Sequence, residues 1–221
     1  MEDMRVLIVG GSPEPSSAVL VANLAAQCNA VVAVDRGLDV LLEVGIACDL
    51  FCGDADSVSE RGAELVHACE AGKPGLVCAV ERYDPHKDYT DLALALRAID
   101  ERWPDAQLVC TCLTGGNPDH ALAVYGRLAA CRESLIELRE DGFRSYVLHG
   151  PFMLHVEDAW GKRFSFVPLS PEAVVSEFGM RWELNCAPVE LLSDLGISNV
   201  IESNNALFTC HEGVVVAWVF D

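Results

Sequence analysis

Long apolar runs and paired cysteine motifs are both missing from this chain. No stretch approaches the roughly 18 consecutive apolar residues of a membrane-spanning helix, so no membrane partner is expected. The ten cysteines include no Cys-x-x-Cys pair and lie mostly in apolar segments, which predicts buried, reduced thiols. The six histidines do not show the spacing of metal ligands. A zinc site is therefore not predicted.

Basic residues are also few: 15 Lys and Arg stand against 34 Asp and Glu, for a formal charge of -19. Such a surface repels nucleic acid, which excludes it as a partner. A phosphate ligand would need local compensation from a carboxylate-bound cation, placed basic residues or helix N-termini. The acidic N-terminus lacks the positive region of a signal peptide, so we expect a cytoplasmic protein.

Residues 1–132 alternate short apolar runs with stretches of helical periodicity, which predicts an α/β, Rossmann-like domain with a parallel sheet. Strands are expected at Arg5–Val9, Ala30–Val34, Leu50–Cys52, Leu76–Val80 and Leu108–Leu113. Helices are expected at Ser17–Gln27, Leu38–Val44, Glu60–Ala71, Thr90–Arg102 and Pro118–Cys131. Ligands of such sheets bind beyond the carboxyl ends of the strands, so the residues that follow each strand are the first candidates.

Residues 133–221 have a different pattern, in which strand follows strand. Asp141-Gly142 is a strong hairpin signal. A short helix is expected only at Pro188–Leu195. Strands are expected at Leu135–Arg139, Phe143–Leu148, Arg163–Val167, Val174–Phe178, Ala206–Cys210 and Val214–Phe220. This half is predicted to be a mainly-β sandwich domain.

An Asp-x-Asp pair, Asp54 and Asp56, follows the third expected strand in Gly53-Asp54-Ala55-Asp56-Ser57. In extended backbone, residues two apart face the same side, so the two carboxylates are expected to converge on one hard cation such as Mg²⁺. The alternative is that they only cap the turn and the following helix.

A second acidic pair lies in His86-Lys87-Asp88-Tyr89-Thr90-Asp91. Asp88 is interpreted as the N-cap of a helix, with Asp91 three residues later as in a capping box. Because the segment follows a neighbouring strand, Asp91 is also a candidate to complete the metal site, with Lys87 and Thr90 facing phosphate.

Glycines follow three other strands of this half. Gly115 and Gly116 precede Asn117-Pro118-Asp119-His120, Gly10 and Gly11 follow the first strand, and Gly37 follows Asp35-Arg36. Such loops let a ligand approach the backbone and a helix N-terminus. Neither a Walker loop nor a dinucleotide fingerprint is present, so each loop alone is weak support.

The order of these motifs is more informative than any single one. Asp35-Arg36-Gly37, Gly53-Asp54-Ala55-Asp56-Ser57, Asp88-Tyr89-Thr90-Asp91, Gly116-Asn117-Pro118-Asp119-His120, Gly179-Met180-Arg181-Trp182-Glu183-Leu184 and Ser198-Asn199 follow one another along nearly the whole chain. In this order the chain resembles the thiamine pyrophosphokinase family. The resemblance implies a homodimer that binds ATP and thiamine, requires Mg²⁺, and transfers a diphosphoryl group from ATP to thiamine.

The resemblance also assigns roles to residues of this chain. It implies Asp54, Asp56 and Asp91 as metal ligands, with Asp88 as a fourth catalytic carboxylate. It implies ATP contacts from Arg36, Lys87, Thr90, Gly115, Gly116, Asp119 and His120. It implies thiamine contacts from Ser176, Trp182, Ser198 and Asn199, with Trp182 stacking on the cationic acceptor.

Three departures from the family pattern are visible: Ala55 replaces Phe, Arg36 replaces Gly, and Asn117 replaces an Arg. Asn117 matters most because it lacks the charge of an arginine, which Arg36 or Arg82 would then have to supply. Two alternatives stay open. One is a related diphosphokinase that acts on another alcohol, such as 6-hydroxymethylpterin, and the other is a thiamine-binding sensor without catalysis.

Overall fold

The computed structural model describes residues 4–83, 89–131 and 136–221. These residues form two compact units. The first contains the chain up to Arg127 together with Arg139–Asp141, and the second contains Leu128–Leu138 and Gly142–Asp221. The predicted boundary between residues 132 and 133 falls in a segment outside the described residues, so it stays a prediction.

The first unit alternates strands and helices, as the periodicity predicts. Its strands are β1 (Arg5–Val9), β2 (Ala30–Val34), β3 (Leu50–Gly53), β4 (Ala79–Arg82) and β5 (Gln107–Thr111). Its helices are α1 (Ala18–Ala25), α2 (Gly37–Val44), α3 (Glu60–Glu70), α4 (Asp91–Arg102) and α5 (Pro118–Ala129), the last of which crosses into the second unit at Leu128.

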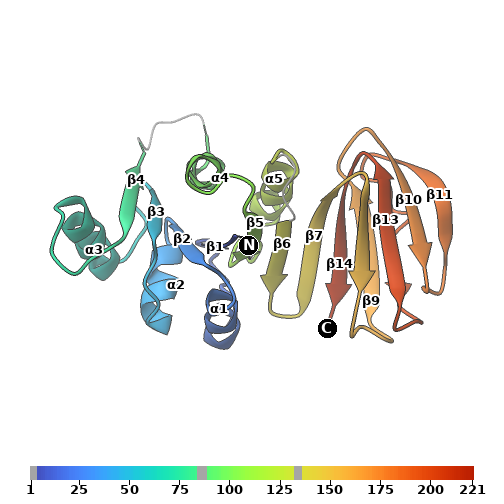
Figure 1. Cartoon of the computed structure of the whole chain (residues 1–221), viewed down its shortest axis with the longest axis horizontal. Coiled ribbons are helices and arrows are strands. Elements are labelled where there is room, and N and C mark those ends of the chain that lie inside the picture. Colours follow the sequence, from blue (N-terminus) through green and yellow to red (C-terminus); the bar gives the residue numbers. More distant parts are fainter. Residues whose placement is uncertain (1–3, 84–88, 132–135) are drawn as a thin grey trace. The chain divides into compact units, whose positions relative to one another are not determined.

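The five strands form a parallel sheet in the order β5-β1-β2-β3-β4. Helices α1 and α2 cover one face of this sheet and α4 covers the other (Figure 1). Strand β2 is buried at every position, as expected for a strand covered on both faces. The direction of the strand order reverses between β1 and β5, which is where open α/β sheets place their ligands.

One strand of this sheet is displaced from its predicted position. The apolar run predicted a strand at Leu76–Val80, whereas β4 begins at Ala79 and ends at Arg82. The side chain of Val77 is 89% exposed, so the start of the run lies outside the sheet. An edge strand packs few side chains, and apolar character therefore indicates its register poorly.

The second unit is a β-sandwich. One sheet contains β12-β9-β14-β7 in that order, with β6 beside β7, and the other contains β11-β10-β13-β8. The bounds are β6 (Ile136–Glu140), β7 (Phe143–His149), β8 (Phe152–Val156), β9 (Arg163–Pro168), β10 (Glu172–Phe178), β11 (Leu184–Glu190), β12 (Asn199–Val200), β13 (Ala206–Glu212) and β14 (Val214–Phe220). Phe166 and Phe208 pack across the two sheets, with ring centroids 5.1 Å apart.

The helix predicted at Pro188–Leu195 is wrong, because Pro188 and Val189 belong to strand β11. Pro188 pairs with Val174 on β10, and β11 is the outermost strand of its sheet. Proline lacks an amide donor and is tolerated on an edge strand, so the residue that suggested a helix start marks a sheet edge instead. Strands β8, β11 and β12 were not predicted.

All ten cysteines are free, as predicted. Five of them are buried, while Cys186 is exposed on β11.

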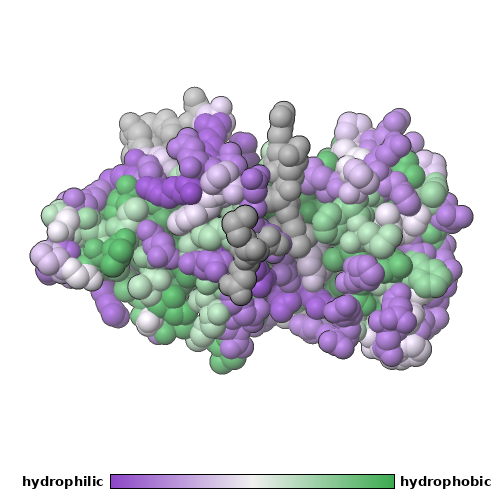
Figure 2. Space-filling view, viewed as in Figure 1, coloured by the Kyte–Doolittle hydropathy of each residue, from purple (hydrophilic) through white to green (hydrophobic). Residues whose placement is uncertain are grey.

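Within the part of the chain that the structure describes, no helix has the length and apolar character needed to cross a membrane. Hydrophilic residues cover much of the visible face, with hydrophobic residues gathered in patches (Figure 2).

Candidate active site

A pocket with a volume of about 590 Å³ lies beyond the carboxyl ends of the strands of the first unit. Gly11 and Ser12 follow β1 and Cys112 and Leu113 follow β5, and all four line the pocket. The pocket therefore lies at the reversal point of the strand order. Its volume is in the range of sites for small organic ligands and cofactors.

Three carboxylates meet beside this pocket. Oxygen atoms of Asp35, Asp54 and Asp56 all lie within 4.8 Å of one another. Asp35 follows β2, and the other two follow β3. Asp35 also lines the pocket together with Asp91, the first residue of α4.

The backbone brings Asp54 and Asp56 together in a way that the sequence did not predict. The segment is a turn rather than an extended strand, because Ala55 has a φ of +61° and the Asp56 amide donates to Asp54 Oδ1 at 3.1 Å. The convergence was predicted, but the alternation of extended backbone is the wrong reason for it. The alternative that these residues cap the turn and the following helix is only partly correct: Asp54 accepts the Asp56 amide within the turn, whereas the N-cap of α3 is Ser59. The turn bond does not prevent the carboxylates from meeting.

The electrostatics of Asp35 indicate a place for a cation. Burial raises the pKa of Asp35, the hydrogen bond from the Ser57 hydroxyl lowers it, and the charges of Asp91, Asp54 and Asp56 raise it further. Asp35 Oδ1 is buried and has no hydrogen-bond partner. A divalent ion would satisfy this oxygen and offset the repulsion among the four carboxylates.

The donor set suits Mg²⁺, which prefers carboxylate oxygens and waters. The oxygens of Asp35, Asp54 and Asp56 all lie within 4.8 Å of one another, so they could share one such ion, with waters as the remaining ligands. The residues present therefore fit this ion. Asp35 was recognised in the sequence only as part of the Asp35-Arg36-Gly37 motif, and its participation in the carboxylate cluster was missed.

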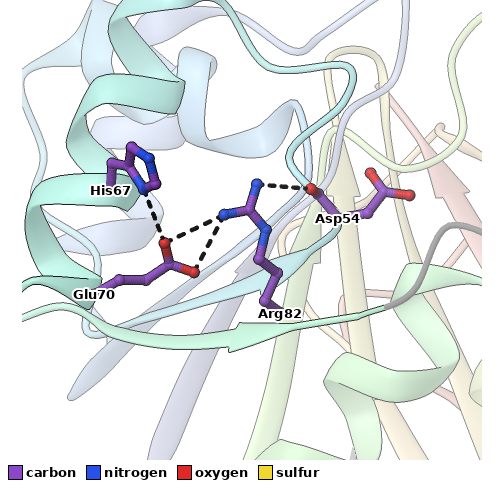
Figure 3. A network of polar contacts seen from close by, with 4 residues as sticks. All are labelled: Asp54, His67, Glu70 and Arg82. Carbon is purple, nitrogen blue, oxygen red and sulfur yellow. Dashed lines mark hydrogen bonds and ion pairs between the residues drawn. The ribbon is translucent and has the colours of Figure 1, made fainter.

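Arg82 supports the loop that carries two of these carboxylates. Its guanidinium donates to the Glu70 carboxylate at 3.2 and 3.3 Å and to the backbone oxygen of Asp54 at 3.3 Å (Figure 3). The Asp54 carboxylate lies on the far side of its own backbone from Arg82. Arg82 is thus engaged on the loop, which leaves Arg36 as the better candidate to replace the charge missing at Asn117.

Most of the residues assigned to ATP by resemblance do line the pocket. They are Arg36, Thr90, Gly115, Asp119 and His120. Gly116 is absent from the lining and has a φ of +85°. Lys87 and Asp88 lie outside the described residues.

The start of α4 differs from the prediction. Its N-cap is Thr90 rather than Asp88, because the Thr90 hydroxyl accepts the Ala93 amide at 3.3 Å. Asp91 is consequently in the first helical turn, where a carboxylate is stabilised by the helix dipole while it faces the pocket.

Gly115 is required by packing rather than by an approaching ligand. A Cβ atom there would lie 2.3 Å from the Glu14 backbone oxygen, and the Ser12 hydroxyl donates to the Gly115 oxygen at 2.9 Å. The loops after β1 and β5 are thus in direct contact. A side chain at position 115 would force them apart and change the pocket.

The residues assigned to thiamine lie in the second unit. The Trp182 side chain is 59% exposed, so its ring is available to a ligand. Asn199 is buried, accepts the Trp182 amide at 3.2 Å, and donates to the Trp182 oxygen at 2.8 Å and to Glu177 at 3.2 Å. Asn199 therefore holds the backbone of Trp182. No sequence motif pointed to Glu177.

The two serines of this group differ in their surroundings. The Ser176 hydroxyl is within 2.7 Å of His211 Nε2 and accepts the Cys186 amide at 2.9 Å. Ser198 has a φ of +65°, and its amide donates to Ser165. Their roles as thiamine contacts stay predictions.

Comparison with known proteins agrees with both units. The family model described as "Thiamin pyrophosphokinase, catalytic domain" matches residues 21–139, more than half of the chain. The model described as "Thiamin pyrophosphokinase, vitamin B1 binding domain" matches residues 153–215. The thiamine pyrophosphokinase of Bacillus subtilis is 29% identical over 188 residues, which cover 84% of each chain.

Solved structures show the same architecture. The thiamin pyrophosphokinase of Geobacillus thermodenitrificans is 26% identical, with a TM-score of 0.75 over 99% of this chain and 98% of that one. The thiamin pyrophosphokinase of Candida albicans, 15% identical, has a TM-score of 0.80 over 100% and 90% and shows the fold alone. With its carboxylate pocket, its β-sandwich and its match to both family models, the chain belongs to the thiamin pyrophosphokinase family of enzymes.

Proposed function

We propose that this protein transfers the diphosphoryl group of ATP to the hydroxyethyl oxygen of thiamine, giving thiamine diphosphate and AMP. The observation that carries the proposal is the meeting of Asp35, Asp54 and Asp56 beside a pocket of about 590 Å³, in a chain of this family. Such transfer depends on positioning and on neutralising phosphate charge rather than on covalent catalysis.

The three carboxylates and Asp91 would hold Mg²⁺, which supplies positive charge to the phosphates when bound. Arg36 at the pocket wall would contact phosphate, and Gly115 would keep the loops after β1 and β5 in contact at that wall. In the reaction, the thiamine oxygen bonds to the β-phosphorus, and the bond from that phosphorus to the oxygen bridging the α-phosphate breaks. AMP leaves with that oxygen, and the hydroxyl proton passes to a base. Asp88 stays a predicted candidate to orient the hydroxyl.

Trp182 supports thiamine as the acceptor. Its ring is exposed and makes a cation–π contact with the Arg181 guanidinium, whose Cζ lies 5.6 Å from the ring centroid. A thiazolium ring carries the same sign of charge on a flat surface. The match of this unit to a vitamin B1 binding model favours thiamine over a pterin alcohol.

The resemblance also leads us to propose a homodimer that acts in the cytoplasm. Exposed apolar side chains in the connection after β11 support self-association, because exposed apolar clusters are typical of interfaces. They are Leu191, Leu192, Leu195 and Ile197. Sedimentation equilibrium of the purified protein tests this, and a monomer at micromolar concentration would contradict it.

The activity is tested by incubating the purified protein with ATP, MgCl₂ and thiamine while following AMP and thiamine diphosphate by chromatography. Equal amounts of the two products are expected, with none when EDTA is present. Product formed only with 6-hydroxymethylpterin would replace the proposal with the related diphosphokinase. Thiamine binding by calorimetry without any product would replace it with the sensor.

A further inference from the structure

Glu140, the last residue of β6, is a buried carboxylate in the first unit. It accepts hydrogen bonds from three successive backbone amides after β5. The Cys112 amide donates to Oε2 at 2.9 Å, the Leu113 amide to Oε1 at 2.8 Å, and the Thr114 amide to Oε1 at 3.1 Å. The Thr114 hydroxyl also donates to Oε1, at 3.2 Å.

The same carboxylate reaches the loop after β1. The Ser16 hydroxyl donates to Glu140 Oε2 at 2.5 Å. One buried side chain therefore joins the loops that follow β1 and β5, and these loops contribute Gly11, Ser12, Cys112 and Leu113 to the pocket wall. Five donor groups therefore bond to the two carboxylate oxygens of Glu140. A carboxylate suits this arrangement because both of its oxygens accept hydrogen bonds.

Glu140 lies outside both family-model matches, which end at residue 139 and begin again at residue 153. It does not line the pocket itself, so any effect on a ligand passes through the loops. Because the carboxylate already occupies the amides of residues 112–114, these amides are not available to bind phosphate.

We propose that Glu140 is a positioning residue that shapes the nucleotide site by holding the loops after β1 and β5 together. The inference rests on the proposed function, in which this pocket binds ATP. A shift of about 1 Å in such a wall costs up to about 100-fold in rate when it carries ligand contacts.

The test is Glu140→Gln, which keeps the shape but turns an NH₂ group toward amide donors. Calorimetry with Mg²⁺ and α,β-methylene ATP, whose α–β bridge resists cleavage, is expected to show about tenfold weaker binding. The KM for ATP should rise in parallel, while the KM for thiamine stays unchanged. Loss of folding alone would not produce this split between two substrates.

The neighbouring Asp141 offers a matched control. It accepts the Ser17 amide at 2.6 Å and the Ser17 hydroxyl at 2.9 Å at the start of α1, and no bond to residues 112–114 is among its described contacts. Asp141→Asn should lower the free energy of unfolding and leave nucleotide affinity unchanged. Equal affinity of folded Glu140→Gln and wild type would overturn the inference, as would an equal loss in Asp141→Asn.

Two further measurements keep the outcome decisive. If Glu140→Gln does not fold, the double variant Ser16→Ala with Thr114→Val removes two of the donors, and about threefold weaker nucleotide binding is expected. Unchanged binding by that variant would overturn the inference. Absence of nucleotide binding by the wild type would overturn the proposed function itself. If the wild type binds nucleotide, the variants test only the role of Glu140.

Discussion

The surroundings of Asp35 favour metal binding but lower the stability of the folded chain, because they hold carboxylates close together. Its partly buried carboxylate faces three others, and burial together with their charges raises its pKa. Without a cation, this repulsion weakens the folded state. One substitution at Asp35 should therefore change activity and stability in opposite directions.

We predict that Asp35→Asn lowers kcat by about 100-fold or more, because an amide is a poor ligand for Mg²⁺ and leaves phosphate charge uncompensated. In EDTA, the same variant should unfold at a higher urea concentration than the wild type. Asp100→Asn, on the exposed side of α4, is the control and should change neither quantity. A variant with normal turnover would remove Asp35 from the metal site.

Trp182 is the residue that should separate the two substrates. Trp182→Ala is expected to raise the Kd for thiamine about tenfold, through loss of stacking and cation–π attraction, with little change in nucleotide affinity. Trp160, in the same unit and 64% exposed, provides a matched control. Calorimetry with each ligand gives both values. Equal weakening of thiamine and nucleotide would show that Trp182 acts only through folding.

At the scale of elements, the sequence predicted most of the first unit because its signals are local. Ser17, Ser59 and Thr90 cap three helices, and four apolar runs supply the buried strands β1, β2, β3 and β5. The second unit was harder to predict. Pro188 resembled a helix start because the pairing that makes it an edge-strand residue joins positions distant in sequence.

The pairing of Glu177 with Asn199 joins the two sheets of the sandwich, since Glu177 lies on β10 and Asn199 on β12. Burial raises the pKa of Glu177 from 4.5 to about 7, although the hydrogen bond from Asn199 lowers it. Because the folded state holds this proton more tightly than the unfolded state, stability falls as the pH rises from about 4.5 to about 7. The full cost, about 3 kcal/mol, is present above pH 7.

We predict that Glu177→Gln removes this cost. The free energy of unfolding of the variant, relative to wild type, should increase by up to about 3 kcal/mol between pH 4.5 and pH 8. Urea denaturation at the two pH values measures it, with Glu172→Gln as the exposed control on the same strand. A difference that does not depend on pH would show that the pKa of Glu177 is not raised in the folded protein.

For the whole molecule, the order of the motifs indicated the family and the general place of the site. What it did not supply depends on contacts between loops. Ala55 in a left-handed conformation turns Asp54 toward Asp56, and Gly115 is needed because Glu14 approaches it. Neither contact follows from residue type, because each is set by chain segments that meet only after folding.

The net charge of -19 should attract a cationic acceptor from a distance. We predict that the KM for thiamine rises a few-fold, by about two- to fivefold, when NaCl increases from about 20 to about 300 mM, because salt screens this attraction. The KM for Mg-ATP should not rise in the same way, since the chain repels that anion. Initial rates at constant Mg²⁺ give both values, and a thiamine KM that falls with salt would contradict the prediction.

The carboxylates that meet at the pocket come from positions 35, 54, 56 and 91, spread across three successive crossings of one sheet. A Mg²⁺ ion bound by all of them would stabilise the folded chain, because unfolding of any one of these segments would release the ion. The bound ion would replace the repulsion among these carboxylates with attraction. Catalytic readiness and resistance to unfolding would rise and fall together with the supply of magnesium.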